Sequence, residues 1–360
     1  MITVSTDSLN VVKEVVEVLQ NGGLVIYPTE TCYGVGVDAT NADSVKKLLK
    51  YKKRPSGKAI SIAVSSLEMA KEYVEINQRA EEIFNTLLPG PFTIVCKSKH
   101  KTDKRLEAEN GTLGVRIPNY KLLIDIINKF GKPITATSAN SSGAKTPYSL
   151  EEVYDTLSNN QKKLIDLAID GGKLPKNPPS TVIDTTTEEL TIYRHGRLNP
   201  KNIKRIQNFI SDSEEDTISI AENLVKQILE QNTSTSEYFL FLLDGELGSG
   251  KTHFAKGIAK ALGINKVIKS PSYNYVNEYP VPGSQRKLFH IDAWKLQDRS
   301  ELETLNILGI LNNYNVIIIE WPTVVFNLDP IYLENLSYVI VEFVILEANK
   351  RMIRVIENTK

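Results

Sequence analysis

The sequence predicts two consecutive α/β domains, each an open twisted sheet with helices packed against it, and the second of them a P-loop domain. At 360 residues the chain exceeds what one hydrophobic core usually serves. Short apolar segments of strand length alternate with amphipathic helical segments along both halves, as in sheets covered by helices. A glycine-rich loop lies between a predicted strand and a predicted helix in the second half.

The elements of the first half follow from hydrophobic periodicity. Apolar residues at helical spacing predict a helix over residues 11–19, and Gly22 and Gly23 end it. Further helices are expected around residues 45–49, 80–88, 121–130 and 149–157. Strands are expected at 24–27, 59–64, 92–97, 114–117, 134–137 and 181–184.

The composition changes near residue 199, and residues 211–216 are polar and mostly acidic. Such a segment suits an exposed boundary, so the sequence predicts a first domain over 1–205, a linker over 206–215 and a second domain over 216–360. Within the second domain we expect helices at 217–230 and 254–262. Strands are expected at 238–243, 287–291, 316–319, 337–346 and 352–356.

Charge and cysteine content limit the function classes. Lys plus Arg and Asp plus Glu number 43 each, so no global field attracts nucleic acid or a membrane, and anion binding must come from local clusters. Cys32 and Cys96 are the only cysteines, which argues against a disulfide framework or a cysteine zinc site. With no signal-peptide pattern and no apolar run of membrane-spanning length, we expect a cytoplasmic protein without membrane contact.

The phosphate-binding loop is the most specific motif. It reads Gly245, Glu246, Leu247, Gly248, Ser249, Gly250, Lys251, Thr252, which matches GxxxxGK[ST] in full. Its glycines let backbone N–H groups surround phosphate oxygens at the start of a helix. We expect Lys251 to neutralise the β- and γ-phosphates of ATP and the Thr252 hydroxyl to bind Mg²⁺.

A P-loop enzyme also requires an acidic residue at the end of a strand, near the metal. Asp292 and Glu320 each end an apolar strand and are the two candidates. The alternative for either is a structural role, capping its strand or pairing with a lysine.

The second half resembles the TsaE family, small P-loop ATPases that assist bacterial tRNA threonylcarbamoylation. The segments that carry the resemblance are 244–252, 270–273, 290–292 and 320–322. It implies that Asp292 and Glu320 serve the metal and ATP hydrolysis, and that Trp321 belongs to the same site. The family usually has Thr and Phe where Ser272 and Tyr273 stand, and these two keep a hydroxyl and a ring.

The first half carries a different kind of anion-binding chemistry. Lys50, Lys52, Lys53 and Arg54 end a predicted helix just before a Pro-Ser-Gly turn, which could hold Lys52 and Arg54 over a cleft. A solvated basic face is the alternative. Residues 135–143 are rich in small hydroxyl and amide side chains, which can bond ribose, phosphate or base edges or can form a surface turn.

Taken in order, these and other segments resemble the YrdC/TsaC family of threonylcarbamoyl-adenylate synthases. They are 27–34, the Lys-x-Arg pair at 52 and 54, the Ser-x-Asn pair at 138 and 140, 88–93, 114–118, 180–182 and 194–196. The resemblance implies that L-threonine and bicarbonate give N-carboxy-threonine, whose carboxylate attacks the α-phosphate of ATP and releases pyrophosphate. The family tends to have Pro-Leu after the basic turn, where this chain has Lys58, Ala59 and Ile60.

The resemblance also implies site residues in the first half. We expect Lys52, Arg54 and Arg116 to neutralise phosphate and carboxylate, and Arg194 to lie at the phosphate end. Ser138, Asn140 and Ser180 would hold the nucleotide. Thr29 and Thr31 would line the threonine pocket. The predicted catalytic set is therefore Lys52, Arg54, Ser138, Asn140 and Glu320.

Both resemblances point to one pathway, threonylcarbamoyladenosine formation on tRNA. The implied partners are TsaB/TsaD-type transferase proteins, with tRNA met through their complex, and the implied small molecules are L-threonine, bicarbonate, ATP and Mg²⁺. One alternative is a first half that binds RNA or the ribosome without catalysis, against which the balanced charge and the intact Lys-x-Arg and Ser-x-Asn pairs argue. Another is a generic P-loop kinase, which would need an acceptor site that the sequence does not show.

Overall fold

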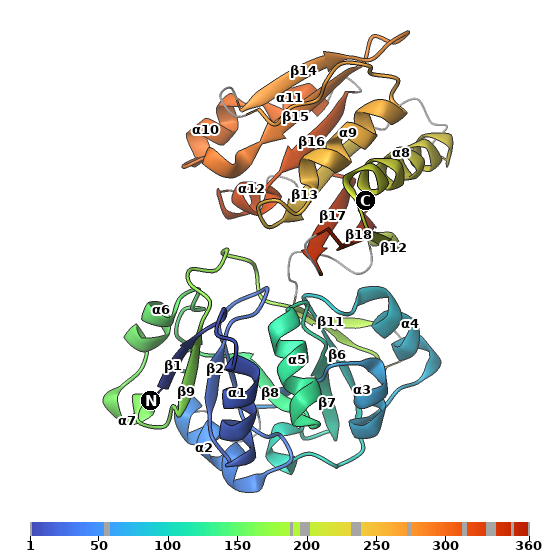
Figure 1. Ribbon diagram of the computed structural model, residues 1–360. Coiled ribbons are helices and arrows are strands. Elements are labelled where there is room, and N and C mark those ends of the chain that lie inside the picture. Colours follow the sequence, from blue (N-terminus) through green and yellow to red (C-terminus); the bar gives the residue numbers. More distant parts are fainter. Residues whose placement is uncertain are drawn as a thin grey trace. The chain divides into compact units, whose positions relative to one another are not determined.

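Contacts along the chain divide it into two units, Met1–Asn199 and Pro200–Lys360 (Figure 1). The structure is a computed structural model, and it describes residues 2–53, 58–187, 190–194, 202–231, 239–271, 275–311, 315–328, 336–346 and 349–358. Each unit is an α/β domain, as the sequence predicts, and each is described by itself.

The first unit alternates strands and helices through most of its length. Its strands are β1 Ile2–Ser5, β2 Val25–Tyr27, β3 Gly34–Gly36, β4 Ser61–Ala63, β5 Val74–Glu75, β6 Phe92–Ser98, β7 Thr112–Arg116, β8 Ile134–Ser138, β9 Leu167–Asp170, β10 Thr181–Asp184 and β11 Thr191–Arg194. Its helices are α1 Val11–Gln20, α2 Ala42–Lys52, α3 Leu67–Tyr73, α4 Gln78–Leu87, the 3-10 turn η1 Lys104–Leu106, α5 Lys121–Phe130, α6 Leu150–Asp155 and α7 Asn159–Lys162.

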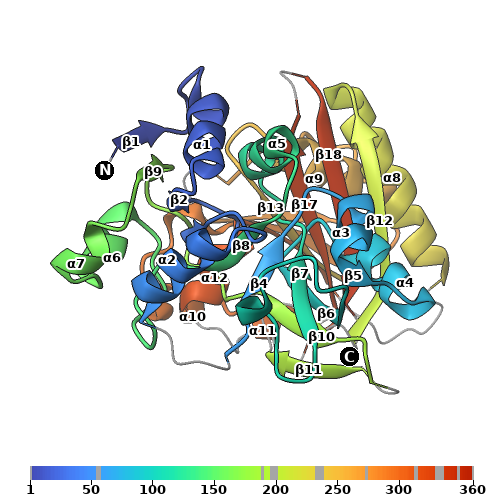
Figure 2. The same ribbon diagram turned by 90° about the horizontal axis from the view of Figure 1, so that it is seen from below.

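These strands form one mixed sheet. Within the described residues its order is β1-β9-β2-β3-β8-β4-β7-β6-β10-β11, with β5 paired to β6. Helices α1 and α5 lie side by side against it (Figures 1 and 2). Their buried residues, among them Val15, Leu19, Ile126 and Ile127, recur at helical spacing and join one core with β2 and β9.

Local sequence sets the ends of the helices that lead to the site. Asn41 caps α2 by accepting hydrogen bonds from the backbone of Asp43 and Ser44. The helix ends at Lys53, whose φ of 47° is left-handed, so Lys52 is its last residue. Gly131, with φ of 75°, ends α5 in the same manner.

The second unit is built around a central parallel group of strands. Its strands are β12 Ile203–Ser211, β13 Phe239–Gly245, β14 Val276–Pro280, β15 Lys287–Asp292, β16 Val316–Glu320, β17 Tyr338–Ile345 and β18 Arg351–Asn358. Its helices are α8 Glu214–Gln231, α9 Lys251–Ala261, the 3-10 turn η3 Ala293–Lys295, α10 Arg299–Thr304, α11 Ile307–Leu311 and α12 Pro322–Leu328.

Within the described residues the order of this sheet is β12-β18-β17-β13-β16-β15-β14. Strand β13 pairs in parallel with β16 and β17, and β15 pairs in parallel with β16. Helices α8 and α9 pack together against one face and bury Leu224, Phe254 and Ile258 with the strands (Figure 1). Strands β15 and β16 are parallel and in register at Asp292 and Glu320. Both residues therefore lie at the carboxyl ends of neighbouring strands, beside the carboxyl end of β13.

The predicted linker over 206–215 is wrong. Residues 203–211 form β12, which pairs antiparallel with β18 along its length, and α8 begins at Glu214. Most side chains of this edge strand are exposed or half-buried, and the polar and acidic residues 211–216, which suggested a linker, begin at its last residue. The second unit is Pro200–Lys360, so it begins inside the span 1–205 that the sequence assigned to the first domain.

None of the helices in the described ranges is long and apolar enough to cross a membrane.

Candidate functional site

A cavity of about 670 Å³ in the first unit gathers the residues that the sequence predicts for its site. Its lining includes Thr29, Thr31, Lys52, Arg116, Ser138, Asn140, Ser180 and Arg194. These residues come from β7, β8, β11, the end of α2 and the loops after β2, after β8 and before β10. Arg54, the ninth predicted residue, lies outside the described residues.

Lys52 is anchored at one wall of the cavity. Its side chain is almost fully buried, with 2% exposed. The ammonium Nζ donates to the backbone oxygens of Ser138 and Asn140, each at 2.6 Å, and to Oδ1 of Asn140 at 3.3 Å. Ser138 Oγ also donates to Asn140 Oδ1 at 2.6 Å. The Lys-x-Arg and Ser-x-Asn segments are therefore joined through Lys52, a positive charge held among acceptors.

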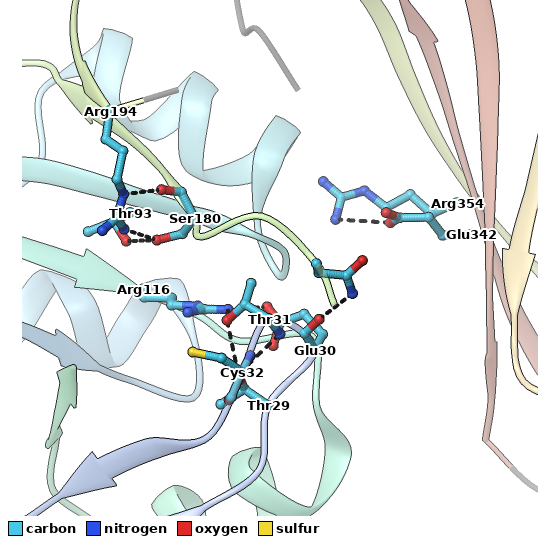
Figure 3. A network of polar contacts seen from close by, with 11 residues as sticks. Thr29, Glu30, Thr31, Cys32, Thr93, Arg116, Ser180, Arg194, Glu342 and Arg354 are labelled. Carbon is cyan, nitrogen blue, oxygen red and sulfur yellow. Dashed lines mark hydrogen bonds and ion pairs between the residues drawn. The ribbon is translucent and has the colours of Figure 1, made fainter. Parts of the chain in front are cut away.

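Arg116 lies in a second wall and is oriented by Glu30. Its Nη2 is 2.6 Å from Glu30 Oε1 and donates to Thr31 Oγ1 at 3.0 Å (Figure 3). Thr31 Oγ1 lies 3.0 Å from Thr29 Oγ1. Among the described residues Arg116 Nε is buried without a hydrogen-bond partner. The guanidinium thus keeps donor capacity for a ligand while Glu30 fixes its direction.

Arg194 and Ser180 form a third group. Arg194 donates through Nε to the backbone oxygen of Ser180 and through Nη2 to Ser180 Oγ, both at 2.8 Å (Figure 3). Burial, reinforced by the positive charge of Arg116, lowers the pKa of Arg194. A guanidinium whose charge is disfavoured by burial and by a neighbouring cation is stabilised when an anion binds beside it.

Sequence reasoning missed several residues of this cavity. Lys58, Ser61, Thr93 and Tyr193 line it, and Glu30 supports it from behind Arg116. The signal for Glu30 was present, because it stands between the two predicted threonines. Lys58 lies six residues after Lys52, and Thr93 ends the segment 88–93 that carries the family resemblance, but neither was assigned to the site. The pairing of β6 with β10 is what brings Thr93 beside Ser180.

In the second unit the P-loop connects β13 to α9 as the motif predicts. Gly248 and Gly250 have φ of 77° and 106°, which a residue with a side chain adopts only at a cost. A Cβ on Gly250 would also lie 2.6 Å from Arg351 Nη1. Lys251 Nζ donates to the backbone oxygens of Gly245 and Glu246, each at 2.8 Å. Burial lowers the pKa of Lys251, although nearby carboxylates oppose the shift.

Both predicted acids face this loop. Thr252 Oγ1 donates to Glu320 Oε1 at 3.0 Å, and the buried His290 places its Nε2 2.9 Å from the same oxygen. Asp292 Oδ2 accepts from Ser270 Oγ at 2.9 Å. His290 and Ser270 were not predicted as site residues, although both lie in the segments that carry the resemblance to TsaE.

Trp321 lies against the P-loop lysine. Lys251 Nζ is 3.9 Å from the centre of the Trp321 ring, a cation–π contact. The Trp294 ring contacts Trp321 at a tilt of 47°, with the ring centres 4.4 Å apart. Trp321 has a left-handed φ of 59°, and its backbone N–H donates to the oxygen of Leu243 at the end of β13. The structure thus brings Trp321 to the phosphate loop.

The donor set fits a magnesium ion. Across the described ranges, no three His, Cys, Asp or Glu side chains gather to hold a metal on their own. A P-loop needs no such cage, because Mg²⁺ keeps waters and phosphate oxygens as ligands and takes only one or two carboxylates from the protein. Thr252 and Glu320, already in contact, with Asp292 on the adjacent strand, supply oxygen ligands of this kind.

Fold and sites together define a two-unit nucleotide-handling protein, with a cationic cavity in one α/β unit and a P-loop in the other. Residues 17–196 match the Sua5/YciO/YrdC family profile, described as "Telomere recombination". Residues 211–352 match the profile described as "Threonylcarbamoyl adenosine biosynthesis protein TsaE". The chain belongs to the Sua5/YciO/YrdC family and carries a TsaE domain after it. The predicted families and their fusion are confirmed.

Two relatives and one solved structure give the scale of the similarity. A threonylcarbamoyl-AMP synthase of Vibrio parahaemolyticus is 32% identical over 181 residues, 49% of this chain and 96% of that protein. One of Aliivibrio fischeri is 37% identical over 149 residues, 41% of this chain and 80% of that protein. The crystal structure of P. abyssi Sua5 complexed with L-threonine is 22% identical, covers 89% of this chain and 91% of that one, and superposes with a TM-score of 0.52. This last likeness supports the fold.

Proposed function

We propose that the first unit condenses L-threonine, bicarbonate and ATP to threonylcarbamoyl-AMP, with release of pyrophosphate. The observation that carries the proposal is the cavity, where eight residues predicted from scattered motifs converge and three of them, Lys52, Arg116 and Arg194, are cations. The family and the names of the Vibrio and Aliivibrio relatives support the same reaction.

The chemistry requires positioning and charge neutralisation more than a covalent nucleophile. The amine of threonine takes up carbon from bicarbonate, with loss of water, and the new carboxylate oxygen attacks the α-phosphorus. The bond from that phosphorus to the bridging oxygen breaks as the new P–O bond forms, and pyrophosphate leaves with the electron pair. Lys52, Arg116 and Arg194 would stabilise the charge that develops on the phosphate and the carboxylate.

The remaining roles follow the chemistry of the side chains. Ser138, Asn140 and Ser180 would hold the nucleotide. Thr29 and Thr31 would line the pocket for the hydroxyl, amino and carboxylate groups of L-threonine. Arg54 keeps its proposed phosphate role from the sequence alone. We assign the catalytic positions to Lys52 and Arg54 with Ser138 and Asn140.

The second unit, we propose, hydrolyses ATP to support a transferase complex of TsaB/TsaD-type proteins that modifies tRNA. Lys251 and the P-loop backbone would bind the phosphates, with Trp321 beside them. Thr252, Glu320 and Asp292 would hold Mg²⁺ or its water shell, and the ion would neutralise phosphate charge. The two cysteines are unpaired, which is consistent with the reducing cytoplasm as its compartment.

The test is to mix the purified full chain with ATP, bicarbonate and L-threonine and to measure pyrophosphate with and without threonine. ATP hydrolysis by the second unit yields phosphate, so pyrophosphate reports on the first unit alone. We expect threonine-dependent pyrophosphate that is retained in Lys251→Ala and lost in the Lys52→Ala, Arg54→Ala double variant. ATP turned over only to ADP and phosphate would refute the synthase and favour a binding role for the first unit.

A further inference from the structure

We propose that Thr93 is a further substrate-binding residue of the first cavity, and that it donates its hydroxyl proton to an anionic oxygen of a bound substrate. The inference rests on the proposed synthase reaction. It comes from counting the hydrogen-bond donors in the group formed by Arg194, Ser180 and Thr93, which we call the hydroxyl chain.

The order of the hydroxyl chain begins with Arg194. A guanidinium has donors and no acceptor, so Ser180 Oγ must accept at the 2.8 Å contact from Nη2. Ser180 Oγ and Thr93 Oγ1 lie 3.0 Å apart, where either could donate (Figure 3). The two hydroxyls carry two protons, and their mutual hydrogen bond uses one.

The second proton therefore needs an acceptor. Thr93 and Ser180 are each 4% exposed, and a buried hydroxyl without a partner is costly. Within the described part of the chain neither hydroxyl has a further acceptor. Both residues line the cavity, so a bound ligand that displaces water can supply the acceptor there.

Cooperativity decides which hydroxyl keeps that proton. Ser180 is polarised by the cation that donates to it, which makes its own O–H a stronger donor toward Thr93. In the resulting chain from Arg194 through Ser180 to Thr93, each oxygen accepts once and donates once. The free proton is then on Thr93 Oγ1, at the end of the chain.

Packing fixes the direction of this hydroxyl. A Cβ placed on Gly114 would lie 3.1 Å from Thr93 Cγ2, so the methyl group of Thr93 packs against the glycine backbone. Strand β6 holds Thr93 in register with Val182 of β10, two residues after Ser180. With its methyl group on Gly114 and its hydroxyl at Ser180, Thr93 has little rotamer freedom.

The acceptor is an oxygen that carries negative charge. Arg194 at the head of the chain supplies a positive charge in this part of the cavity, and burial together with the charge of Arg116 lowers its pKa. A phosphate oxygen of ATP and the carboxylate of threonine or N-carboxy-threonine share the required chemistry. Kinetics for the two substrates distinguish these sources.

The experiment compares Thr93→Val, which keeps the shape and removes the donor, with Thr93→Ser, which keeps the donor. Threonine-dependent pyrophosphate release by the full chain is measured while ATP and threonine are varied separately. Loss of one hydrogen bond to a charged group predicts that Thr93→Val raises one KM, or lowers kcat/KM, by about tenfold or more. Thr93→Ser should stay within about threefold of the wild type. A raised KM for ATP identifies phosphate, and a raised KM for threonine identifies carboxylate.

Thr185→Val is the matched control. Thr185 is also a buried threonine, at the end of β10, but its hydroxyl already donates to the backbone oxygen of Val95 at 2.9 Å. This variant tests what a valine costs in this sheet, and both KM values should stay unchanged. If Thr93→Val does not fold, as judged by thermal unfolding, Thr93→Ala replaces it.

Three results would overturn the inference. In the first, Thr93→Val keeps both KM values and kcat. In the second, Thr93→Ser is as impaired as Thr93→Val, so that the methyl packing and not the hydroxyl is required. In the third, Ser180→Ala loses threonine-dependent pyrophosphate release while Thr93→Val keeps it, which would assign the free proton to Ser180. A wild-type chain without threonine-dependent pyrophosphate would instead refute the synthase function itself.

Discussion

Replacing Lys52 by Met should destabilise the first unit and abolish its activity. Lys52 donates to Ser138 O, Asn140 O and Asn140 Oδ1 from a side chain that is 2% exposed. Methionine keeps most of the buried stem, so the packing loss is small and the loss of the ammonium dominates. The contacts tie the end of α2 to the segment after β8.

The magnitude follows from the acceptors left behind. A buried acceptor that loses its partner costs about 1–3 kcal/mol, and the cavity lets water reach part of this group. We therefore expect about 2–4 kcal/mol for the whole set, which lowers the Tm of a domain of this size by roughly 4–16 °C.

The assay is differential scanning calorimetry of the full chain beside its Lys50→Met variant. Lys50 is an exposed lysine on the same helix, and its replacement should change stability by less than about 0.5 kcal/mol. Trp294 and Trp321 are the only tryptophans, so fluorescence assigns the transition of the second unit. Equal transitions of the first unit in both variants would refute the anchoring role of Lys52.

Three further predictions concern other contacts. Burial raises the pKa of Cys96 to about 11. Since the folded pKa exceeds the unfolded value, Cys96 stabilises the fold below pH 9, and about 3 kcal/mol is lost as the pH rises from 9 to 11. Denaturant titrations between pH 9 and 11 should show that the free energy of unfolding of the wild type falls by about 3 kcal/mol more than that of Cys96→Ala. Equal pH dependence of the two proteins would contradict the raised pKa of Cys96. ADP should change the fluorescence of Trp321, because a bound phosphate draws the ammonium of Lys251 away from the Trp321 ring. The change should vanish in Trp321→Phe. A change that persists in Trp321→Phe would show that it does not come from the contact between Lys251 and Trp321. Gly250→Ala should weaken ATP binding at least tenfold by calorimetry, since a residue with a Cβ rarely adopts the φ of 106°. Unchanged affinity would mean that the loop relaxes freely.

The sequence could predict the main elements because their patterns are local. The helix expected over 121–130 is α5 with the same bounds, since its apolar stripe and the following Gly131 mark both face and end. The strands expected at 181–184 and 287–291 correspond to β10 and β15. Strands β1, β3 and β12 were missed, because their strand conformation depends on neighbours far away in sequence.

The candidate sites divide in the same way. The P-loop is contiguous, so its residues and its place between β13 and α9 could be predicted together. In the first unit the resemblance to a family supplied the residues, and the structure brings the described ones to one cavity. Glu30 behind Arg116, His290 beside Glu320 and Thr93 beside Ser180 were not predicted, because each contact joins segments 30 or more positions apart.

By itself the sequence determined the two α/β domains, the phosphate loop and the families, since periodicity, glycine placement and short motifs are written in consecutive residues. Tertiary structure alone decided that residues 203–211 complete a sheet, because a strand's partner lies outside its own segment. It also decided the direction of the hydroxyl chain. Hydrogen-bond donors and acceptors can be counted only once strand register has placed Arg194, Ser180 and Thr93 against each other.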